Sequence, residues 1–470
     1  MFRVKFYLKT ILLIFPLSPI HFVFAETTEN NQDTAAENFK FIRYEENYDY
    51  LNDGQSRKGL EHLKNILIGS DWRLTVGGSL RERYEYYSHD NFGTPQSDGD
   101  GYLIHRLLLH TDLRKEHDFR MFVELGNTLT ADKTNPAPPY EDQLDLQQAF
   151  LEFKLPQQYL GDHAFIRTGR QEMVFGAQRL ISIRDAPAVR RTFDAFLISG
   201  QRSNWNYSGF YGNTVKLKKG TWDDSRDQDE ALWGTYLTRK NSESTPLGLD
   251  LYYLGLKNND SRYVSGMGEE KRHSVGMRVF GCYGNFELDT EGLYQFGDFK
   301  NQEISAWGFT ADSGYHFDQA VIKSRVGLKV TGSSGDRNSN DDTLHTYNGL
   351  YPKMAYFNQA GLLGTQNMID VQPNLTFYPN NSLTITLAHD LLWRQTTHDA
   401  VYNSIGIPLQ NTAGQGSKYT SGQSSLDIAW KLNPYLNFNG GFVYVDVSDS
   451  LKKVGGQDAT FSYLTLIYSF

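Results

Sequence analysis

The stretch Phe165–Phe196 decides the fold of this chain, and its sequence is FIRTGRQEMVFGAQRLISIRDAPAVRRTFDAF. Its first half alternates in character, so that Thr168, Arg170 and Glu172 share one face of an extended strand. The loop that follows is crowded with charged residues: Arg179, Arg184, Asp185, Arg190, Arg191 and Asp194. A strand with an arginine and a carboxylate on one face, followed by such a loop, needs water on that side. We interpret the stretch as the wall of a solvated channel, and a surface strand of a soluble sheet is the alternative.

The same alternation runs through the rest of the chain, in long segments that each end in a turn. Leu383, Ile385 and Leu387, for example, alternate with two threonines. We count eighteen such segments, and single-chain bacterial outer-membrane barrels have an even number of strands. Soluble sandwiches also alternate, but their strands average about five or six residues. The sequence therefore predicts an all-β fold, a transmembrane antiparallel β-barrel of about 18 strands over residues 71–470.

Composition agrees with this prediction. The chain has 29 Tyr, 29 Phe and 42 Gly but only 14 Pro, which is typical of a β protein. Beyond the N-terminus it has no run of apolar residues long enough for a transmembrane helix. The net charge of −9 does not favour a nucleic-acid partner. An exported, aromatic-rich chain without apolar spans indicates the outer membrane of a Gram-negative bacterium.

The first 70 residues differ from the rest. Residues 1–25 have the features of a signal peptide, with basic residues followed by a mostly apolar stretch, and we expect cleavage after Ala25. Residues 26–70 are predicted to be a periplasmic lead-in or a short plug. Within them Leu60 and Leu63 recur at helical spacing, which predicts a helix up to Leu67.

The last segment of the chain alternates and ends on an aromatic residue. Leu464, Leu466, Tyr468 and the terminal Phe470 share one face. This ending resembles the signal that the outer-membrane assembly machinery recognises. The alternative is an amphipathic strand that ends in phenylalanine by chance.

Motifs for catalysis are not found. The sequence has no nucleophile elbow, no zinc-protease helix motif and no phosphate-binding loop, so we predict neither enzyme activity nor a cofactor nor a metal site. Two aspartate pairs, Asp223–Asp224 and Asp341–Asp342, are compatible with calcium in loops, but their spacing is not diagnostic.

Charged residues instead gather on the polar faces of the predicted strands. The basic ones are Arg81, Arg83, Arg106, Arg120, Arg170, Lys323, Arg325 and Arg394. The acidic ones are Glu124, Glu172, Asp390 and Asp427. Arginines that line a pore attract a passing anion, and nearby carboxylates limit how tightly it is held. The alternative is that these groups pair across the lumen and brace the barrel, and the two roles are compatible.

Four short segments resemble the alginate export family of outer-membrane barrels. They are RTGRQ at 167–171, DLQQAFLEF at 145–153, AGLLG at 360–364 and DLLWR at 390–394. The resemblance covers roughly residues 72–470. It implies an eighteen-stranded barrel whose electropositive constriction passes an anionic uronate polysaccharide.

The same resemblance implies roles for particular residues. Arg170 and Arg394 lie in the matching motifs and take the role of pore arginines, and Asp185 takes that of a constriction acid. The sequence departs from the family at Asn439, where an arginine is expected. One pore cation is then missing, which leaves alginate itself open as the substrate.

The leading hypothesis is thus an outer-membrane channel that passes an anionic polysaccharide or oligosaccharide through an arginine-lined pore. Two alternatives stay open: a porin for uptake of small carboxylates, and a structural or adhesin barrel with a plugged lumen. The expected partners are the saccharide, outer-membrane lipid, the assembly machinery that recognises Phe470, and periplasmic export proteins. Conductance separates the plugged barrel from the two channels.

Overall fold

A computed structural model describes residues 39–51, 57–93, 99–115, 118–242 and 245–470. The predicted signal peptide lies outside the described residues. Within them, no helix has both the length and the apolarity needed to cross a bilayer. The helices are short: α1 (Gln157–Leu160), α2 (Asp449–Lys452) and the 3-10 turns η2 (Arg43–Glu45), η3 (Gly59–Leu63), η4 (Asp90–Gly93) and η5 (Pro138–Tyr140).

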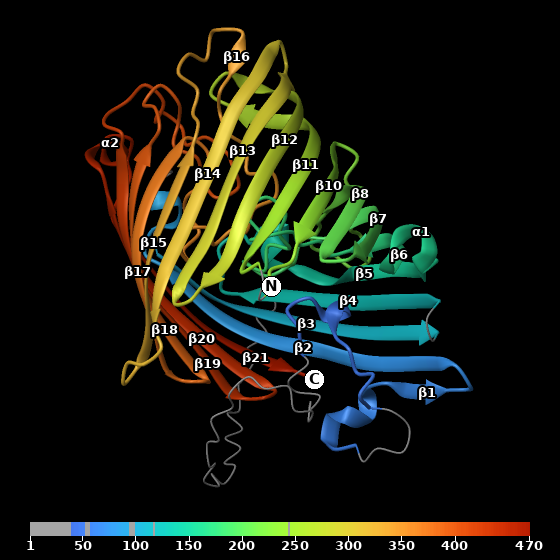
Figure 1. The fold of residues 1–470 in the computed structure, drawn as a ribbon. Coiled ribbons are helices and arrows are strands. Elements are labelled where there is room, and N and C mark those ends of the chain that lie inside the picture. The colour runs from blue at the N-terminus through green and yellow to red at the C-terminus, as the bar shows by residue number, and fades with distance from the viewer. Residues whose placement is uncertain (1–38, 52–56, 94–98, 116–117, 243–244) are drawn as a thin grey trace, which may run out of the picture.

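Eighteen long strands form the wall of the molecule (Figure 1). They are β2 (Trp72–Tyr87), β3 (Asp100–Lys115), β4 (Phe119–Ala131), β5 (Asp142–Lys154), β6 (Asp162–Gln171), β7 (Phe193–Arg202), β8 (Trp205–Lys216), β10 (Glu230–Arg239), β11 (Leu247–Tyr263), β12 (Gly266–Tyr283), β13 (Phe286–Phe299), β14 (Gln302–Phe317), β15 (Lys323–Ser333), β17 (Met368–Asn380), β18 (Leu383–Arg394), β19 (Tyr419–Asn433), β20 (Leu436–Val447) and β21 (Ala459–Ser469). Three short strands are additional to the wall: β1 (Ile66–Ile68), β9 (Ser225–Arg226) and β16 (Thr343–Leu344).

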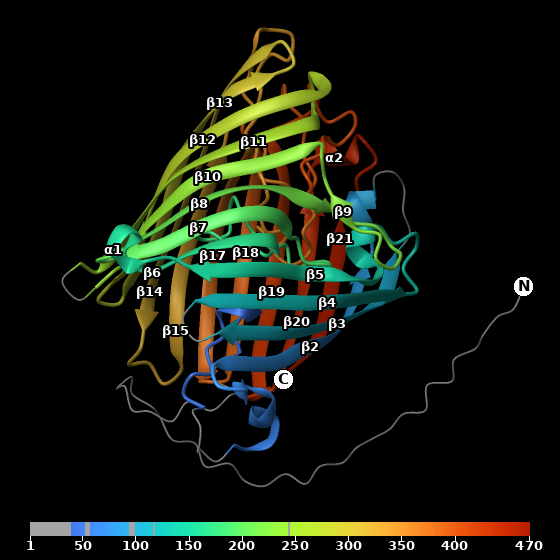
Figure 2. The same cartoon turned by 90° about the vertical axis from the view of Figure 1, so that its right-hand side faces the viewer.

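Each wall strand pairs antiparallel with the next, and the last pairs with the first. β21 lies beside β2, with Ser79 opposite Ser469 in the register (Figures 1 and 2). Gly78 and Phe470 complete this seam with two backbone hydrogen bonds of 2.9 and 3.0 Å. The sheet is therefore a closed barrel, and the predicted eighteen-stranded all-β fold is confirmed. Most of the long loops lie at one end of the barrel, which marks that end as extracellular and the other as periplasmic.

Alternation decides what each face of the wall carries. On β21 the side chains of Leu464, Leu466 and Tyr468 are exposed on the outside. On the neighbouring β2 the alternate residues Arg81 and Arg83 are buried on the inside. An apolar outside and a charged inside are the inverse of a soluble protein, and this arrangement fits a wall in contact with lipid.

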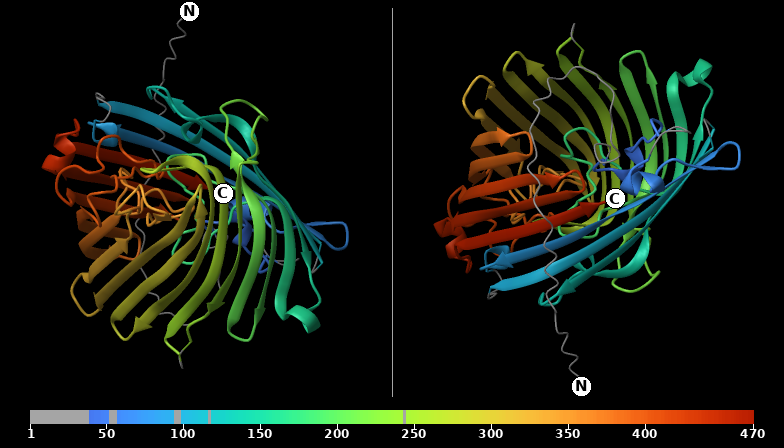
Figure 3. Two further views of the ribbon diagram at one scale, coloured as in Figure 1. Left: turned by 90° about the horizontal axis from the view of Figure 1, so that it is seen from above. Right: turned by 90° about the horizontal axis from the view of Figure 1, so that it is seen from below.

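The 172–192 loop, which connects β6 to β7, crosses the lumen. At one end Arg81 of β2 donates to the backbone carbonyl of Asp185 at 2.9 Å. At the other end Arg179 donates to Asp289 and Glu291 of β13, at 2.9 and 2.8 Å. Since β2 and β13 lie on far sides of an eighteen-strand ring, the loop must pass through its interior, as the end-on views in Figure 3 indicate.

The 334–367 loop, which precedes β17, also folds into the lumen. Its Tyr351 exchanges backbone hydrogen bonds with Leu180 and Ser182 of the 172–192 loop, at 2.9 and 3.0 Å. Further along, the carbonyl of Ala360 accepts a bond from the Tyr87 hydroxyl at 2.9 Å. The two loops are thus joined to each other and to the wall, and together they narrow the pore.

The N-terminal segment 39–51 lies inside the barrel near its periplasmic end. The Tyr44 ring packs edge-on against Phe150 of β5, with centroids 5.4 Å apart. Its carbonyl accepts a hydrogen bond from Arg120 at 2.5 Å, and the Phe41 carbonyl accepts one from Arg190 at 3.0 Å. This segment therefore fills part of the lumen below the 172–192 loop.

The predicted helix before β2 is wrong. Only the 3-10 turn η3 forms, and β1 then pairs with β2, with Ile66 opposite Leu74. Asn65 separates the two elements at a φ of 49°, in the left-handed region where an α-helix cannot continue. The leucine spacing was therefore a poor guide to this segment.

Candidate functional site

A cavity of about 550 Å³ lies between the two lumen loops and the extracellular ends of β10 and β11. Arg184, Arg191 and Lys353 line it. Among the described residues none of these three forms a salt bridge. Arg184 instead donates to the carbonyl of Val189 at 3.4 Å, and Arg191 to that of Ser182 at 3.3 Å. Arg262 and the carboxylates Asp227, Glu230 and Asp260 line the cavity as well, so charges of both signs surround it.

The pKa values of these cations reflect their burial. Burial lowers the pKa of Arg191 to about 10, and burial together with the neighbouring Arg191 lowers that of Arg184 to about 9. Lys353 lies between this cavity and a neighbouring one of about 300 Å³, which Arg179 and Lys329 also line. Burial in this setting, with Lys329 and Arg179 nearby, lowers the pKa of Lys353 to about 8. An anion in the cavity would supply the missing counter-charge.

Glu230 is a carboxylate on the wall of the same cavity. It accepts hydrogen bonds from Thr214 at 2.9 Å, Asn258 at 2.8 Å and the Tyr351 hydroxyl at 3.0 Å. These neutral donors hold it against the wall. Its charge still acts on Arg191 and, with those of Asp227 and Asp260, tempers the positive charge of the cavity, which favours passage over tight retention.

Asp185 is the anchor of the 172–192 loop. Its carboxylate contacts three guanidiniums, those of Arg190 at 2.7 Å, Arg106 at 2.9 Å and Arg81 at 3.3 Å. Burial alone would raise its pKa, but the three arginines outweigh burial and hold the pKa well below the usual range. The predicted residues Arg81, Arg106 and Asp185 thus meet at one point in the lumen.

A second cavity, of about 320 Å³, lies on the other side of Asp185. Arg83, another predicted residue, lines it and pairs with Glu85 at 2.5 Å, with its guanidinium 4.4 Å from the Tyr463 ring centroid. Asn439 also lines this cavity, at the position where the family resemblance implies an arginine. The lumen here accordingly has one cation fewer than that resemblance implies.

The expected inward orientation of Arg170 is wrong. In the register Arg170 lies opposite Ala149 and Asp194, on the wall face that exposes Phe196. Its guanidinium pairs with Asp194 at 2.9 Å. The inward arginine of this strand is Arg167. Both faces of β6 carry an arginine, so alternation alone could not distinguish them.

Arg394 faces inward as predicted, but it does not line an open pore. Its guanidinium is fully buried beneath the 395–418 loop. It donates only to backbone carbonyls of that loop, those of Thr397, Asp399, Thr412, Gln415 and Ser417. The side chain therefore organises the loop, and a passing anion cannot reach it.

Three more predicted residues lie around the N-terminal segment. Arg120 pairs with Asp112 at 2.7 Å while it holds the Tyr44 carbonyl. Glu124 and Glu172 are completely buried, and Arg190 is 3.5 Å from Glu172. These carboxylates support the segment and the 172–192 loop and do not face either cavity.

The remaining predicted residues are spread along the wall. Asp390 is fully buried and accepts a hydrogen bond from Gln372 at 2.5 Å. Arg325 pairs with Glu287 at 2.6 Å and Asp312 at 2.8 Å. Lys323 is exposed at the periplasmic end of β15. None of the three lines the two cavities described above.

Sequence reasoning assigned no site role to three cations that the structure brings together. Arg184 and Arg191 belong to the charged loop noted in the sequence, so their signal was visible. Lys353 lies in a long loop without periodicity, where no pattern singles it out. Its place beside the two arginines depends on the pairing of Tyr351 with the 172–192 loop.

The fold is similar to those of outer-membrane porins. A BenF-like porin from Pseudomonas fluorescens Pf-5 matches with a TM-score of 0.58 and 10% identity, over 84% of this chain and 98% of that one. OccAB4 of Acinetobacter baumannii gives 0.57 and 11%, over 85% and 98%. OccK3 (OpdO) of Pseudomonas aeruginosa gives 0.55 and 14%, over 84% and 95%. At these identities the likeness concerns the fold alone.

A comparison with curated protein sequences finds no match. The family model for alginate export matches residues 72–464, which is nearly the whole barrel. Together with the closed barrel, this match identifies an outer-membrane channel protein of a Gram-negative bacterium, whose family and fold are those of transport channels. The chain belongs to the alginate export family.

Proposed function

We propose that this protein passes an anionic saccharide, a uronate chain or oligomer, across the outer membrane. The observation that carries the proposal is the lumen cavity lined by Arg184, Arg191 and Lys353, none of which forms a salt bridge among the described residues. Carboxylates spaced along a uronate chain would pass these cations one after another. Tyr351 and Tyr356 also line the cavity.

A porin for small carboxylates is the second candidate. Two lumen loops narrow the barrel, and a cavity of about 550 Å³ encloses only a short segment of a polymer. The porin-like fold is equally compatible with small solutes. The two candidates differ in how the channel responds to chain length.

Planar-bilayer recording tests both. Oligouronates should block the current from either side, and the block should lengthen with each added sugar, because a longer chain occupies several lumen cations at once. Neutral oligosaccharides of equal length serve as the control. Equal block by a monomeric carboxylate would favour the small-solute porin, and a barrel without conductance would contradict both channels.

Lys353 should make the block depend on pH. Its lowered pKa of about 8 means that it is charged below that pH and neutral above it. We therefore expect the oligouronate block to weaken several-fold between pH 7 and pH 9, a range in which sugar carboxylates stay ionised. In Lys353→Arg residue 353 stays charged across this range, so the dependence should weaken, and the part that remains comes from Arg184, whose pKa is about 9. A wild-type block that is constant over this range would remove Lys353 from the site.

The ends of the chain support two further parts of the proposal. Segment 39–51 acts as a plug at the periplasmic side, where periplasmic export partners would displace it. Phe470 is the residue that the assembly machinery recognises. Its backbone lies in the seam with Gly78, and its ring stacks on Tyr468 at 6.0 Å between centroids.

A further inference from the structure

The extracellular rim of the wall has a notch at β6 and β7. These strands end at Gln171 and begin at Phe193, whereas the neighbouring β5 continues up to Asp142 (Figure 2). The 217–224 loop, which follows β8, fills the notch. Its Trp222 amide donates to the carbonyl of Leu144 on β5 at 3.0 Å.

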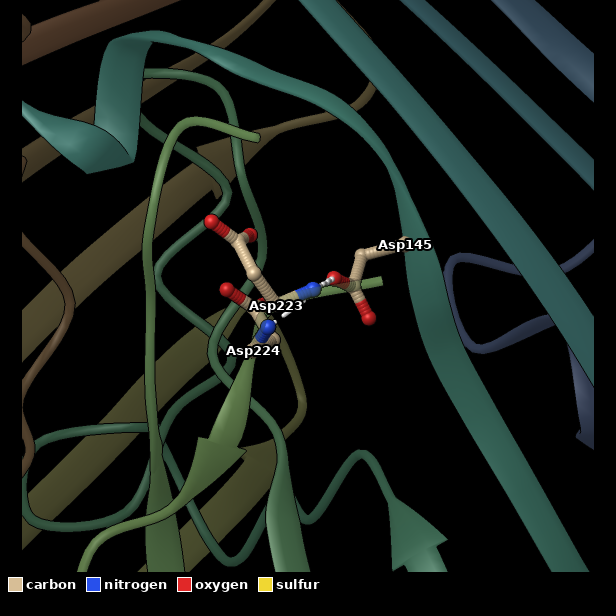
Figure 4. Close-up of side chains that lie close together, drawn as sticks. All are labelled: Asp145, Asp223 and Asp224. Atoms are coloured by element: carbon tan, nitrogen blue, oxygen red, sulfur yellow. Dashed lines mark hydrogen bonds between the residues drawn. The ribbon is translucent and has the colours of Figure 1, made fainter. Parts of the chain in front are cut away.

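Carboxylates converge where this loop meets β5. Asp145 comes from the strand, and Asp223 and Asp224 come from the loop (Figure 4). One oxygen of each lies within 4.8 Å of the others. The Asp145 carboxylate also accepts hydrogen bonds from the amides of Asp223 and Asp224, at 2.9 and 3.0 Å. Two loop carboxylates are thus held in place beside a buried one.

Asp142, which precedes Asp145 by three residues on β5, provides an independent observation. Its side chain is 95% buried, since only 5% of it is exposed, and its charge interacts with those of Asp224, Asp145 and Asp223. Its Oδ1 atom is buried without a hydrogen-bond partner among the described residues, and so is Oδ1 of Asp223. A buried carboxylate oxygen without a donor is costly unless a cation satisfies it.

Nearby basic residues do not neutralise this cluster. Arg170 is 3.8 Å from Asp145, but its closer partner is Asp194, at 2.9 Å. Lys219 of the loop pairs with Glu141, at 3.7 Å. Four carboxylates therefore share at most one arginine.

We propose that Asp142, Asp145, Asp223 and Asp224 bind a calcium ion that holds the 217–224 loop in the notch. Calcium accepts six to eight oxygen ligands at about 2.3–2.6 Å in flexible geometry. Two ligands of one such ion lie at most about 5 Å apart, which the oxygens of Asp145, Asp223 and Asp224 satisfy, and Asp142 would complete the set from beside them. Magnesium demands a stricter octahedron and is the weaker candidate. The ion completes the wall where β6 and β7 fall short.

Terbium luminescence tests this proposal on the refolded full-length barrel in detergent. Trp222 directly precedes Asp223 in the chain, so its excitation should sensitise a bound terbium ion. Calcium should displace terbium and remove the luminescence, and magnesium should do so only at much higher concentration. Trp222→Phe should remove the luminescence while calcium still raises the unfolding temperature, which places the ion beside this residue.

The variant Asp223→Asn with Asp224→Asn should lose both the luminescence and the calcium-dependent rise. The matched control carries the same two changes at Asp341 and Asp342, an exposed pair in another extracellular loop, and should keep both. If the first variant does not fold, as judged by heat-modifiable gel migration, Asp224→Asn alone is measured by the same criterion. The proposal would be overturned if the wild-type protein gave no luminescence that calcium displaces. It would also be overturned if the Asp223→Asn, Asp224→Asn variant kept the wild-type luminescence and calcium response.

Discussion

Replacing Arg184, Arg191 and Lys353 together by glutamine is expected to abolish most of the anion preference of the channel. At a separation of about 8 Å and an effective dielectric constant of about 20, each cation stabilises an anion in the cavity by about 2 kcal/mol. Lumen water and salt reduce this value. Even a third of this stabilisation energy per residue would change the anion-to-cation permeability ratio more than tenfold.

Reversal potentials in a salt gradient measure this ratio directly. A matched control removes three cations from outside the cavity, Lys240, Lys257 and Lys271, which are exposed. It should keep the wild-type selectivity. If the triple cavity variant also keeps it, the selectivity arises elsewhere in the lumen, and the saccharide hypothesis loses its main support.

Asp185→Asn is expected to have the second large effect, on the 172–192 loop. The change preserves shape but removes the charge that three arginines share. Arg81 and Arg106 would then be buried without a counter-ion, at a cost of about 2–3 kcal/mol. The estimate is modest because the Asp185 carboxylate keeps 32% of its surface exposed to lumen water. We expect a lower unfolding midpoint and a noisier, larger open-channel current.

Acidification distinguishes this anchor from an ordinary carboxylate. Folding lowers the pKa of Asp185, so its stabilisation is fully present above the unfolded value of about 3.9 and is lost only as pH falls through the lower folded value. The wild-type loop should therefore stay in place at pH 4, with no added noise in the open-channel current. The open-channel current of Asp185→Asn should be noisy at every pH. A variant current as steady as that of the wild type would show that the backbone contacts suffice to hold the loop.

How much the sequence could predict is clear from particular strands. β17 and β18 follow their alternation closely, because lipid on one side and water on the other select the residue at every position. The strand expected in the first half of the 165–196 stretch, with Glu172 on its polar face, instead stops at Gln171. Beyond that point the chain turns inward, where Met173 packs among residues of the lumen loops and of the neighbouring strands. Periodicity marks an extended segment and cannot tell whether it stays in the wall.

The site was harder to predict than the fold. The inward position of Arg394 followed from alternation, but its burial depends on five carbonyls of a loop that has no periodic pattern. Lys353 reaches the cavity only because one loop pairs with another. Asp145 lies 78 residues from Asp223, so no local spacing could join them. Contacts between loops depend on the closed barrel as a whole.

The seam between Gly78 and Phe470 sets the order in which this protein can fold. Nearly the whole chain must be present before its first and last strands meet, and closing so long a loop costs roughly 5 kcal/mol in chain entropy. Until then β2 has an unpaired edge that no lipid can satisfy. Once formed, the ring has no free end from which strands can peel. Slow formation and slow loss are therefore two results of the same pairing, and the lifetime of the native state should exceed what its equilibrium stability alone implies.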